Sequence, residues 1–241
     1  MDEIYALTHR VGYFQVDRNH RIQLGSLFKL LQEAAIHHAN QANIGTRIME
    51  ERGESWILNR VAMQLERYPR VDEMMTIKTW ATQMKHFKGF RDFRIWVGDE
   101  LIGQVSTLWL YVDFKTKTIT RLPKHIETDF PTQPDQLYFE ELDRLRLPKP
   151  GPDAEKTTIT LRYSDIDGNQ HVNNAVYMDF LQTALHHQNL GTRPKELKIQ
   201  FSKEISPKAE SVYIHLKQEE ETLRYGISYD QELAAFGHIS P

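Results

Sequence analysis

The sequence predicts an α+β fold built from two copies of one unit, in which a long helix is wrapped by an antiparallel β-sheet. Two stretches, residues 27–38 and 177–185, place apolar side chains three and four positions apart, which is typical of one buried helical face. Segments rich in Val, Ile, Trp, Phe and Tyr follow each of these stretches, and this composition favours strands. The third observation is a sequence repeat, which divides the chain into equivalent halves.

The first domain is expected at residues 1–130. It opens with residues 4–16, where the alternating run Tyr13-Phe14-Gln15-Val16 predicts a strand. The helix that follows has Ser26 as its predicted N-cap and Gly45 beyond its end. Four strands are then expected, at residues 55–68, 73–83, 89–98 and 101–113, with a hairpin turn at residues 98–100.

A linker is expected at residues 131–156, because five of the ten prolines fall between Pro131 and Pro152. The second domain, residues 157–241, then repeats the pattern of the first. It opens with a strand at residues 157–163 and a helix at 175–189, whose N-cap is Asn173 or Asn174. Strands are expected to follow near residues 195–204, 210–218, 222–229 and 232–239.

The repeat is clearest in the helices, where LQEAAIHHANQANIGTR at Leu31 resembles LQTALHHQNLGTR at Leu181. The offset from Gln32 to Gln182 is larger than the offset from Gly45 to Gly191, so the first helix should be longer by about one turn. Further on, VAMQL at Val61 matches LKIQF at Leu197. Before the helices, the first copy has Asp17, Asn19 and Arg21 where the second has Asp167, Asn169 and His171.

The composition excludes several classes of function. The chain has 241 residues, of which 40% are hydrophobic, so it is able to bury a large core. A formal net charge of −3 argues against general nucleic-acid binding, which usually involves a strongly basic domain. Because there are no cysteines, thiolate metal ligands and a cysteine nucleophile are ruled out. The N-terminus lacks a leader-like pattern and no apolar run reaches about 18 residues, so we expect a cytoplasmic protein without membrane insertion.

A polar cluster at residues 164–174, SDIDGNQHVNN, places carboxylates, amides and an imidazole directly before the second helix. Free N–H groups and the positive end of the helix dipole favour negative charge there, which suits a reaction that develops an oxyanion. A capping loop rich in Asn and Asp is the alternative interpretation. The adjacent histidines at 37–38 and 186–187 lack a recognised ligand spacing, so we expect no metal and no other cofactor.

This cluster resembles the signature of the acyl-acyl-carrier-protein thioesterases, a plant-type family with bacterial members, which reads Ser-Asp-Leu-Asp-x-Asn-x-His-Val-Asn-Asn. The similarity extends to LFKLLQEAAIHHA, the strand at Trp56, LERYPRVDEMMTIKTW, FKGFRDFRIW and LKIQFSKEI. The resemblance implies a tandem (double) hot-dog fold. It also implies hydrolysis of fatty acyl-acyl-carrier protein to free fatty acid and holo-carrier protein in fatty acid biosynthesis. An acyl-CoA thioesterase and a non-catalytic acyl-thioester-binding module are the alternatives.

By this resemblance, Asp167, Asn169 and His171 match the family's catalytic loop, and Glu204 matches the glutamate after its next strand. Plant relatives often have a cysteine after that glutamate, where this chain has Ile205, so a thiol is not essential here. In our preferred mechanism Glu204 activates water, Asn169 and His171 position the water or the thioester, and Asp167 fixes Asn169. Two alternatives stay open for Glu204: a nucleophile that forms an anhydride, and an exposed charge at a strand end.

The resemblance also implies contacts with the acyl chain and with the acyl carrier protein. The first copy is expected to line the pocket for the acyl tail through Met49, Trp56, Ile57 and Met63. Asn173 and Asn174 are also expected to bind the substrate. An acidic carrier requires local basic surface, for which we predict Lys85, Lys88 and Arg91. An ordinary solvated strand edge explains these charges equally well. We expect a monomer or a homodimer.

Overall fold

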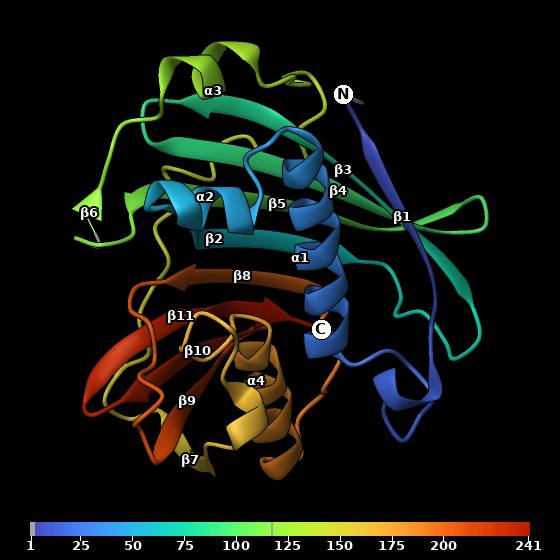
Figure 1. Cartoon of the computed structure of the whole chain (residues 1–241). Coiled ribbons are helices and arrows are strands. Elements are labelled where there is room, and N and C mark those ends of the chain that lie inside the picture. Colours follow the sequence, from blue (N-terminus) through green and yellow to red (C-terminus); the bar gives the residue numbers. More distant parts are fainter. Residues whose placement is uncertain (1–2, 117) are drawn as a thin grey trace.

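The computed structural model describes residues 3–116 and 118–241, and within them the strands form one 11-stranded antiparallel sheet (Figure 1). The spatial order is β1-β3-β4-β5-β2-β8-β11-β10-β9-β7, and β6 pairs with β5. Along the chain the strands are β1 (Tyr5–Arg10), β2 (Glu54–Leu65), β3 (Met74–Lys85), β4 (Lys88–Val97), β5 (Glu100–Asp113), β6 (Thr118–Ile119), β7 (Glu155–Thr160), β8 (Glu196–Phe201), β9 (Ser211–Glu219), β10 (Thr222–Tyr229) and β11 (Glu232–Ser240).

The strand order is symmetric about the middle of the sheet, where β2 pairs with β8. Moving outward, β5 and β11 come next, followed by β4 and β10, β3 and β9, and finally β1 and β7. Ala62 pairs with Lys198, which is its counterpart when Val61 is aligned with Leu197, so the pseudo-two-fold axis passes through this pair. The predicted tandem of two copies, a double hot-dog fold, is confirmed.

Two long helices, α1 (Leu24–Gln41) and α4 (Val176–His187), lie on the same face of the sheet (Figure 1). Each buries one apolar stripe against the strands and against the other helix, which joins the two halves into one core. α1 has 18 residues and α4 has 12, so the first helix is the longer one, as predicted. Two short helices that the sequence did not predict, α2 (Thr46–Arg52) and α3 (Lys124–Asp129), lie beside the first half.

Backbone hydrogen bonds show where the repeat changes its spacing. Before the helices, the bond from Gln23 N to Gln15 O recurs between Asn173 N and Asp165 O, at the offset that relates Gln32 to Gln182. After the helices, the bond from Ile44 N to Ala39 O recurs between Leu190 N and Leu185 O, at the smaller offset that relates Gly45 to Gly191. The extra residues of the first copy are therefore inserted within α1, where they add about one helical turn.

Three local predictions were wrong. Residues Tyr13–Gln15 form a 3-10 turn instead of a strand. Ser26 lies inside α1, and neither Asn173 nor Asn174 is the N-cap of α4, because that position belongs to Ala175. In the first helix a distant side chain replaces the local cap, because Gln182 Oε1 accepts a hydrogen bond from the Leu24 N–H at 2.7 Å.

The segment predicted as a linker packs across the face of the sheet opposite to α1 and α4. Residues 131–154 contain no helix or strand, and β7 begins at Glu155. Leu142 is buried in a separate cluster with Ala62 and Leu108, which point away from the helices because side chains alternate along a strand. This segment therefore covers the outer face of the central strands.

Candidate active site

The loop that carries the predicted catalytic residues is a tight turn closed by backbone pairing. Ile166 and Val172 form an isolated antiparallel bridge, and the Asp167 N–H donates to the His171 carbonyl at 2.9 Å. Gln170 has a φ of 63°, and the Asp167 Oδ1 accepts the Asn169 N–H at 2.9 Å. The same contacts form at Asp17 in the first copy, so the sequence match between the two loops reflects one backbone structure.

Asp167 holds the loop against the start of α4. Its Oδ2 accepts a hydrogen bond from Asn173 Nδ2 at 3.1 Å, and the Asn173 Oδ1 accepts the Ala175 N–H at 2.8 Å. Both ends of the Asn173 amide are thus used within the protein, although this residue lines the cavity described below. Asp167 contacts the backbone of Asn169, whose side chain is exposed.

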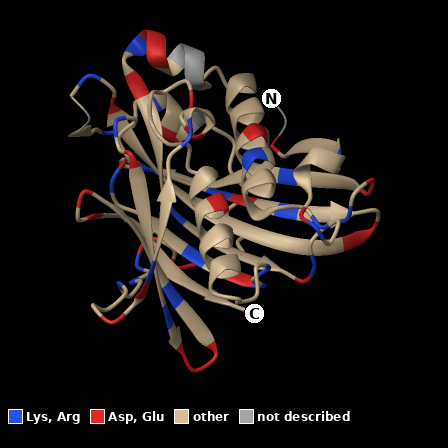
Figure 2. Cartoon of the chain, turned by 90° about the horizontal axis from the view of Figure 1, so that it is seen from below, with Lys and Arg blue, Asp and Glu red and all other residues tan. Residues whose placement is uncertain are grey.

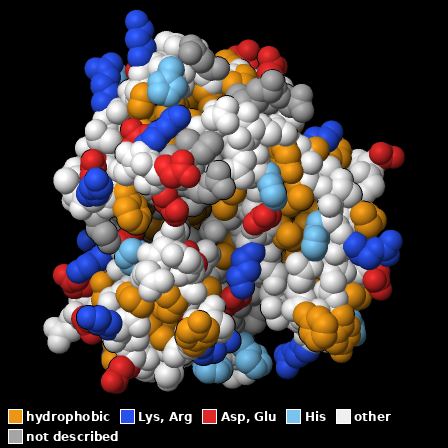
Figure 3. Space-filling model, viewed as in Figure 1, with side chains coloured by type: hydrophobic (Ala, Val, Ile, Leu, Met, Phe, Trp, Pro, Cys, Tyr) orange, Lys and Arg blue, Asp and Glu red, His pale blue; other side chains and the backbone are white. Residues whose placement is uncertain are grey.

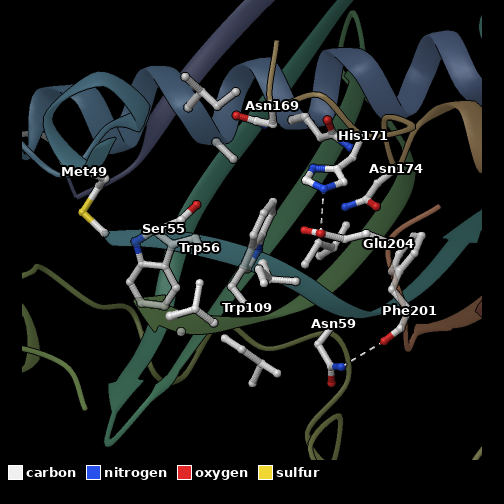
Figure 4. Close-up of a pocket in the computed structure, with 18 of the residues that line it drawn as sticks. Met49, Ser55, Trp56, Asn59, Trp109, Asn169, His171, Asn174, Phe201 and Glu204 are labelled. Carbon is white, nitrogen blue, oxygen red and sulfur yellow. Dashed lines mark hydrogen bonds and ion pairs between the residues drawn. The ribbon is translucent and has the colours of Figure 1, made fainter. Parts of the chain in front are cut away.

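Glu204 follows the end of β8, and the carbonyl of the next residue, Ile205, accepts the Val172 N–H of the loop at 3.4 Å. The Tyr229 hydroxyl donates to the Glu204 carbonyl at 2.9 Å, and Ile205 is fully buried, so the backbone here is held from both sides. The Glu204 Oε2 lies 2.9 Å from His171 Nε2 (Figure 4). The side chains of His171 and Glu204 are 24% and 42% exposed, so the pair is sheltered and still open to a substrate.

This pair borders a cavity of about 470 Å³ between α1, α2 and the central strands. Figure 3 shows that the face with the helices is hollowed between α2 and the loop before α4. The polar end of the cavity is formed by Asp167, Asn169, His171, Asn174 and Glu204. In Figure 4, Asn169 and Asn174 flank the His171–Glu204 pair, while Met49 and Trp56 lie at the opposite end.

Three of the four predicted tail-pocket residues line this cavity, namely Met49, Trp56 and Ile57. Met63 does not line it, because its side chain is buried in the main core beneath the helices. The sequence suggested Met63 because it is one of the bulky apolar residues that follow the first helix. A bulge between Leu58 and Arg60 shifts the register of β2, and beyond it the inward side chains meet the core.

Arg91 was predicted to contact the carrier protein, but the structure places it away from the surface. Its side chain is only 6% exposed and points inward, where Nη1 donates to His38 Nδ1 at 2.9 Å and to Thr79 Oγ1 at 3.2 Å. Burial lowers the pKa of Arg91 to about 10. Lys85 is exposed, and Lys88 is half-buried in an ion pair with Asp143 at 3.2 Å. A charged residue on a strand reaches solvent on one face only, and Arg91 lies on the inner face.

Some residues of the site were missed in the sequence. Trp109 of β5 lines the cavity, and its indole N–H donates to Thr107 Oγ1 at 2.9 Å. Asn59 also lines the cavity, and its Nδ2 donates to the Phe201 carbonyl at 3.1 Å, which joins the two halves beside the reacting end (Figure 4). Asn59 sits at the bulge of β2, and because this strand carries several other polar residues, the sequence offered no signal that singled it out.

The described part of the chain contains neither a cluster of metal ligands nor a long apolar helix. Among these residues, no group of three or more His, Asp and Glu side chains is placed to hold a metal ion. None of the helices there combines the length and the apolar character needed to cross a bilayer.

Models of two known domains match nearly the whole chain. The acyl-ACP thioesterase N-terminal domain matches residues 2–130, and the acyl-ACP thioesterase C-terminal domain matches residues 149–239. The chain belongs to the acyl-ACP thioesterase family. The resemblance seen in the polar cluster is thereby confirmed over both halves of this thioesterase-family chain.

Individual relatives are distant. The chloroplastic acyl-[acyl-carrier-protein] hydrolase FATB2 of Cuphea viscosissima is 24% identical over 190 residues, covering 74% of this chain and 46% of the relative. The chloroplastic dodecanoyl-[acyl-carrier-protein] hydrolase of Cinnamomum camphora is 24% identical over 191 residues, covering 74% of this chain and 50% of the relative. The chain therefore spans about half the length of the curated relatives it matches.

Solved structures of the family share the fold over the full chain. An acyl-ACP thioesterase from Bacteroides thetaiotaomicron superposes with a TM-score of 0.87 at 20% identity, covering 99% of this chain and 97% of the other. The 12:0-ACP thioesterase from Umbellularia californica superposes with a TM-score of 0.82 at 16% identity, covering 100% of this chain and 97% of the other. Because these sequence identities are low, the structural similarity establishes the double hot-dog fold alone.

Proposed function

We propose that this chain hydrolyses the thioester of fatty acyl-acyl-carrier protein, releasing free fatty acid and holo-carrier protein. The observation that carries the proposal is the 2.9 Å contact between His171 and Glu204 at the polar end of a cavity whose other end is apolar. An acyl chain fits the apolar end, and its thioester then reaches the pair. The relatives named acyl-carrier-protein hydrolases support the same reaction class.

In the proposed mechanism Glu204 acts as general base. Its carboxylate removes a proton from a water molecule, and the water oxygen attacks the thioester carbonyl carbon. His171 holds the carboxylate through the Nε2 contact, and Asn169 and Asn174 flank the reacting group. When the tetrahedral intermediate collapses, the C–S bond breaks and the sulfur leaves as a thiolate. Because a free thiol has a pKa of ~8.5, the leaving group requires little help from an acid.

Asp167 has a positioning role in this proposal. It holds the Asn169 backbone and the Asn173 amide, so it fixes the loop on which His171 stands. Attack by Glu204 itself, through an anhydride, is the rival mechanism. Recovery of oxygen-18 from labelled water in the Glu204 carboxylate after a single turnover would favour the anhydride route.

The proposed partner is an acidic acyl carrier protein that presents its acyl chain on phosphopantetheine. Figure 2 shows basic and acidic residues interspersed over the sheet and its loops, so docking would depend on a local basic surface. Lys85, which is exposed, and Lys88, which is half-buried, remain the proposed contacts after the correction of Arg91.

Release of free thiol from matched acyl-carrier-protein and acyl-CoA substrates tests this function. We expect turnover with both and a higher kcat/KM for the carrier-protein substrate. A clear preference for acyl-CoA would replace the proposal with an acyl-CoA thioesterase. Tight binding of an acyl thioester without thiol release would identify a binding module instead.

A further inference from the structure

One buried polar atom beside the cavity has no hydrogen-bond partner in the part of the chain that the structure describes. Gln32 lies in the middle of α1 and lines the cavity together with His171, Asn174 and Glu204. Its Nε2 is buried and has no hydrogen-bond partner among the described residues. A buried amide without a partner costs free energy, so its retention calls for an explanation.

The repeat supplies an internal comparison, since Gln182 of α4 is the counterpart of Gln32. Both ends of the Gln182 amide are used: Oε1 accepts the Leu24 N–H and Nε2 donates to the Thr192 carbonyl, each at 2.7 Å. In the second copy, this glutamine is therefore a structural residue that connects α4 to α1 and to the segment before β8.

The inserted turn of α1 explains why Gln32 lacks the second of these contacts. The counterpart of Thr192 is Thr46, and the chain from Gln32 to Thr46 is longer than the chain from Gln182 to Thr192 by this turn. One additional helical turn moves the acceptor about 5 Å along the helix, beyond the reach of the amide. The extra turn of α1 thus leaves a donor available beside the cavity.

The repeat also relates Gln32 to the reacting end of the cavity. Gln182 contacts Leu24, and the offset that relates Gln32 to Gln182 makes Asn174 the counterpart of Leu24. Gln32 and Asn174 both line the cavity. The Gln32 Nε2 donates no hydrogen bond to Asn174 or to any other described residue. Because Asn174 lies beside His171 and Glu204 in Figure 4, the pseudo-two-fold relation brings the Gln32 amide to the same end.

We propose that Gln32 is a catalytic residue, whose Nε2–H donates a hydrogen bond to the thioester carbonyl oxygen and to the oxyanion that forms from it. This inference rests on the proposed thioesterase function. The site has a specific need for such a donor, because the negative charge develops near the Asp167 carboxylate, while Glu204 is occupied with the proton that it took from the water. Asn173 is already committed to Asp167, and Asn169 is exposed to water, so Gln32 is a sheltered neutral donor.

Substitution of Gln32 separates this role from a structural one. Gln32→Leu keeps the bulk of the side chain and removes the donor, and should lower kcat and kcat/KM together by about 10²-fold. Its thermal stability should be equal to or above that of the wild type, because the substitution removes a buried group without a partner. A kcat within about twofold of the wild type would overturn the proposal.

Gln182→Leu is the matched control. This substitution removes the same amide from the equivalent place in the other helix, where two hydrogen bonds are lost. We expect a lower melting temperature with kcat per folded molecule almost unchanged. An equal loss of kcat in Gln32→Leu and Gln182→Leu would mean that both glutamines act through the packing of the helices, which would also overturn the proposal.

Gln32→Glu gives a second test that depends on protonation. A glutamic acid is able to donate a hydrogen bond only while it is protonated, so kcat of this variant should fall as the pH rises through ionisation of the new carboxyl group. Over the same pH range Gln32→Leu should show no such additional loss. If the pH profile of Gln32→Glu follows that of the wild type, Gln32 does not donate to the reacting carbonyl.

A binding experiment keeps the result separate from the proposed function. A ketone analogue, in which a methylene replaces the thioester sulfur, is bound and its labelled carbonyl stretch is recorded by infrared spectroscopy. The stretch should move to lower frequency in the wild type and lose that shift in Gln32→Leu. If the wild type hydrolyses no thioester but shows the shift, the proposed function fails while the contact stands. Without a difference between the two proteins, the contact itself is wrong.

Discussion

Arg193 Nη1 of the second copy donates a hydrogen bond to Asp17 Oδ2 of the first copy at 2.9 Å. The counterpart of Asp17 is Asp167, which accepts a hydrogen bond from the neutral Asn173 amide instead. Both aspartates close the same turn, but the first is held by an ion pair between the halves, next to Arg21 in the histidine position. The two loops have therefore diverged, one toward a contact between the halves and the other toward the cavity.

This ion pair should contribute to acid sensitivity. Burial by itself would raise the pKa of Asp17, but hydrogen bonds from the Arg21 and Asn19 N–H groups and from Arg193 lower it below the usual value. Its contribution to stability is thus present above that usual value and is lost as the pH falls through the lowered pKa. Arg193→Met should reduce this acid-dependent part by about 1 kcal/mol or less, measured by urea unfolding at several pH values. An identical pH dependence in both proteins would contradict it.

The His171–Glu204 pair should determine the rate of thioester hydrolysis. Glu204→Gln removes the proposed base and His171→Ala removes its partner, so each should lower kcat by about 10²-fold or more, with a smaller effect on substrate affinity. Steady-state kinetics with one acyl-carrier-protein substrate checks this. Retention of near-normal turnover by both variants would rule out a catalytic role for the pair.

The apolar end of the cavity should select the length of the acyl chain. Met49 lines the cavity, so Met49→Ala should favour longer chains and Met49→Phe shorter ones. Each buried methylene is worth ~0.8 kcal/mol, so a wall moved by two or three carbons shifts the preference by about 10–50-fold. The measurement is kcat/KM for acyl chains of about eight to eighteen carbons.

Met63 provides the control for this prediction, because it lies in the core and does not line the cavity. Met63→Ala should reduce the free energy of unfolding by about 2–5 kcal/mol and leave the chain-length profile unchanged. A shift of the profile in Met63→Ala but not in Met49→Ala would place the acyl chain elsewhere.

Recognition of the carrier protein should depend on Lys85 and Lys88. Lys85→Glu combined with Lys88→Gln should lower kcat/KM for an acyl-carrier-protein substrate and leave a small acyl thioester nearly unaffected. Raised ionic strength should act in the same direction, because exposed charges more than ~10 Å apart are screened at about 0.1 M salt. Lys195→Glu, at an exposed position before β8, serves as the control. Equal losses for both substrates would assign these lysines to the fold.

Asp92 should make stability depend on pH between about 4 and 6. Burial raises the pKa of this carboxyl group to about 6 from an ordinary value of 3.8. Its favourable contribution is therefore complete below 3.8 and is lost as the pH rises through 6. From low to neutral pH, the free energy of unfolding of the wild type should therefore fall by about 3 kcal/mol, and Asp92→Asn should not show this fall.

Urea unfolding of Asp92→Asn and wild type across this pH range measures the difference. Asp135→Asn, which changes an exposed carboxylate, is the matched control and should run parallel to the wild type. If the difference between Asp92→Asn and the wild type stays constant with pH, Asp92 is not the group that titrates.

The sequence by itself determined the features that depend on local periodicity and on the repeat. Apolar spacing located both long helices, and alternation with β-rich composition located the strands to within a few residues. The spacing between Gln32 and Gln182, compared with that between Gly45 and Gly191, predicted the extra turn of α1. The order of Asp167, Asn169 and His171 indicated one polar loop, because a turn closed by its own backbone brings nearby residues together.

Only the tertiary structure decided which distant side chains share the cavity. It brings Glu204 to His171, directs Arg91 inward to His38 and places Met63 in the core. The sequence shows that a residue lies on a strand, but the face that it occupies changes with a single bulge, such as the one in β2. The unpaired amide of Gln32 became visible for the same reason: hydrogen-bond partners depend on distances between elements, which the order of residues does not contain.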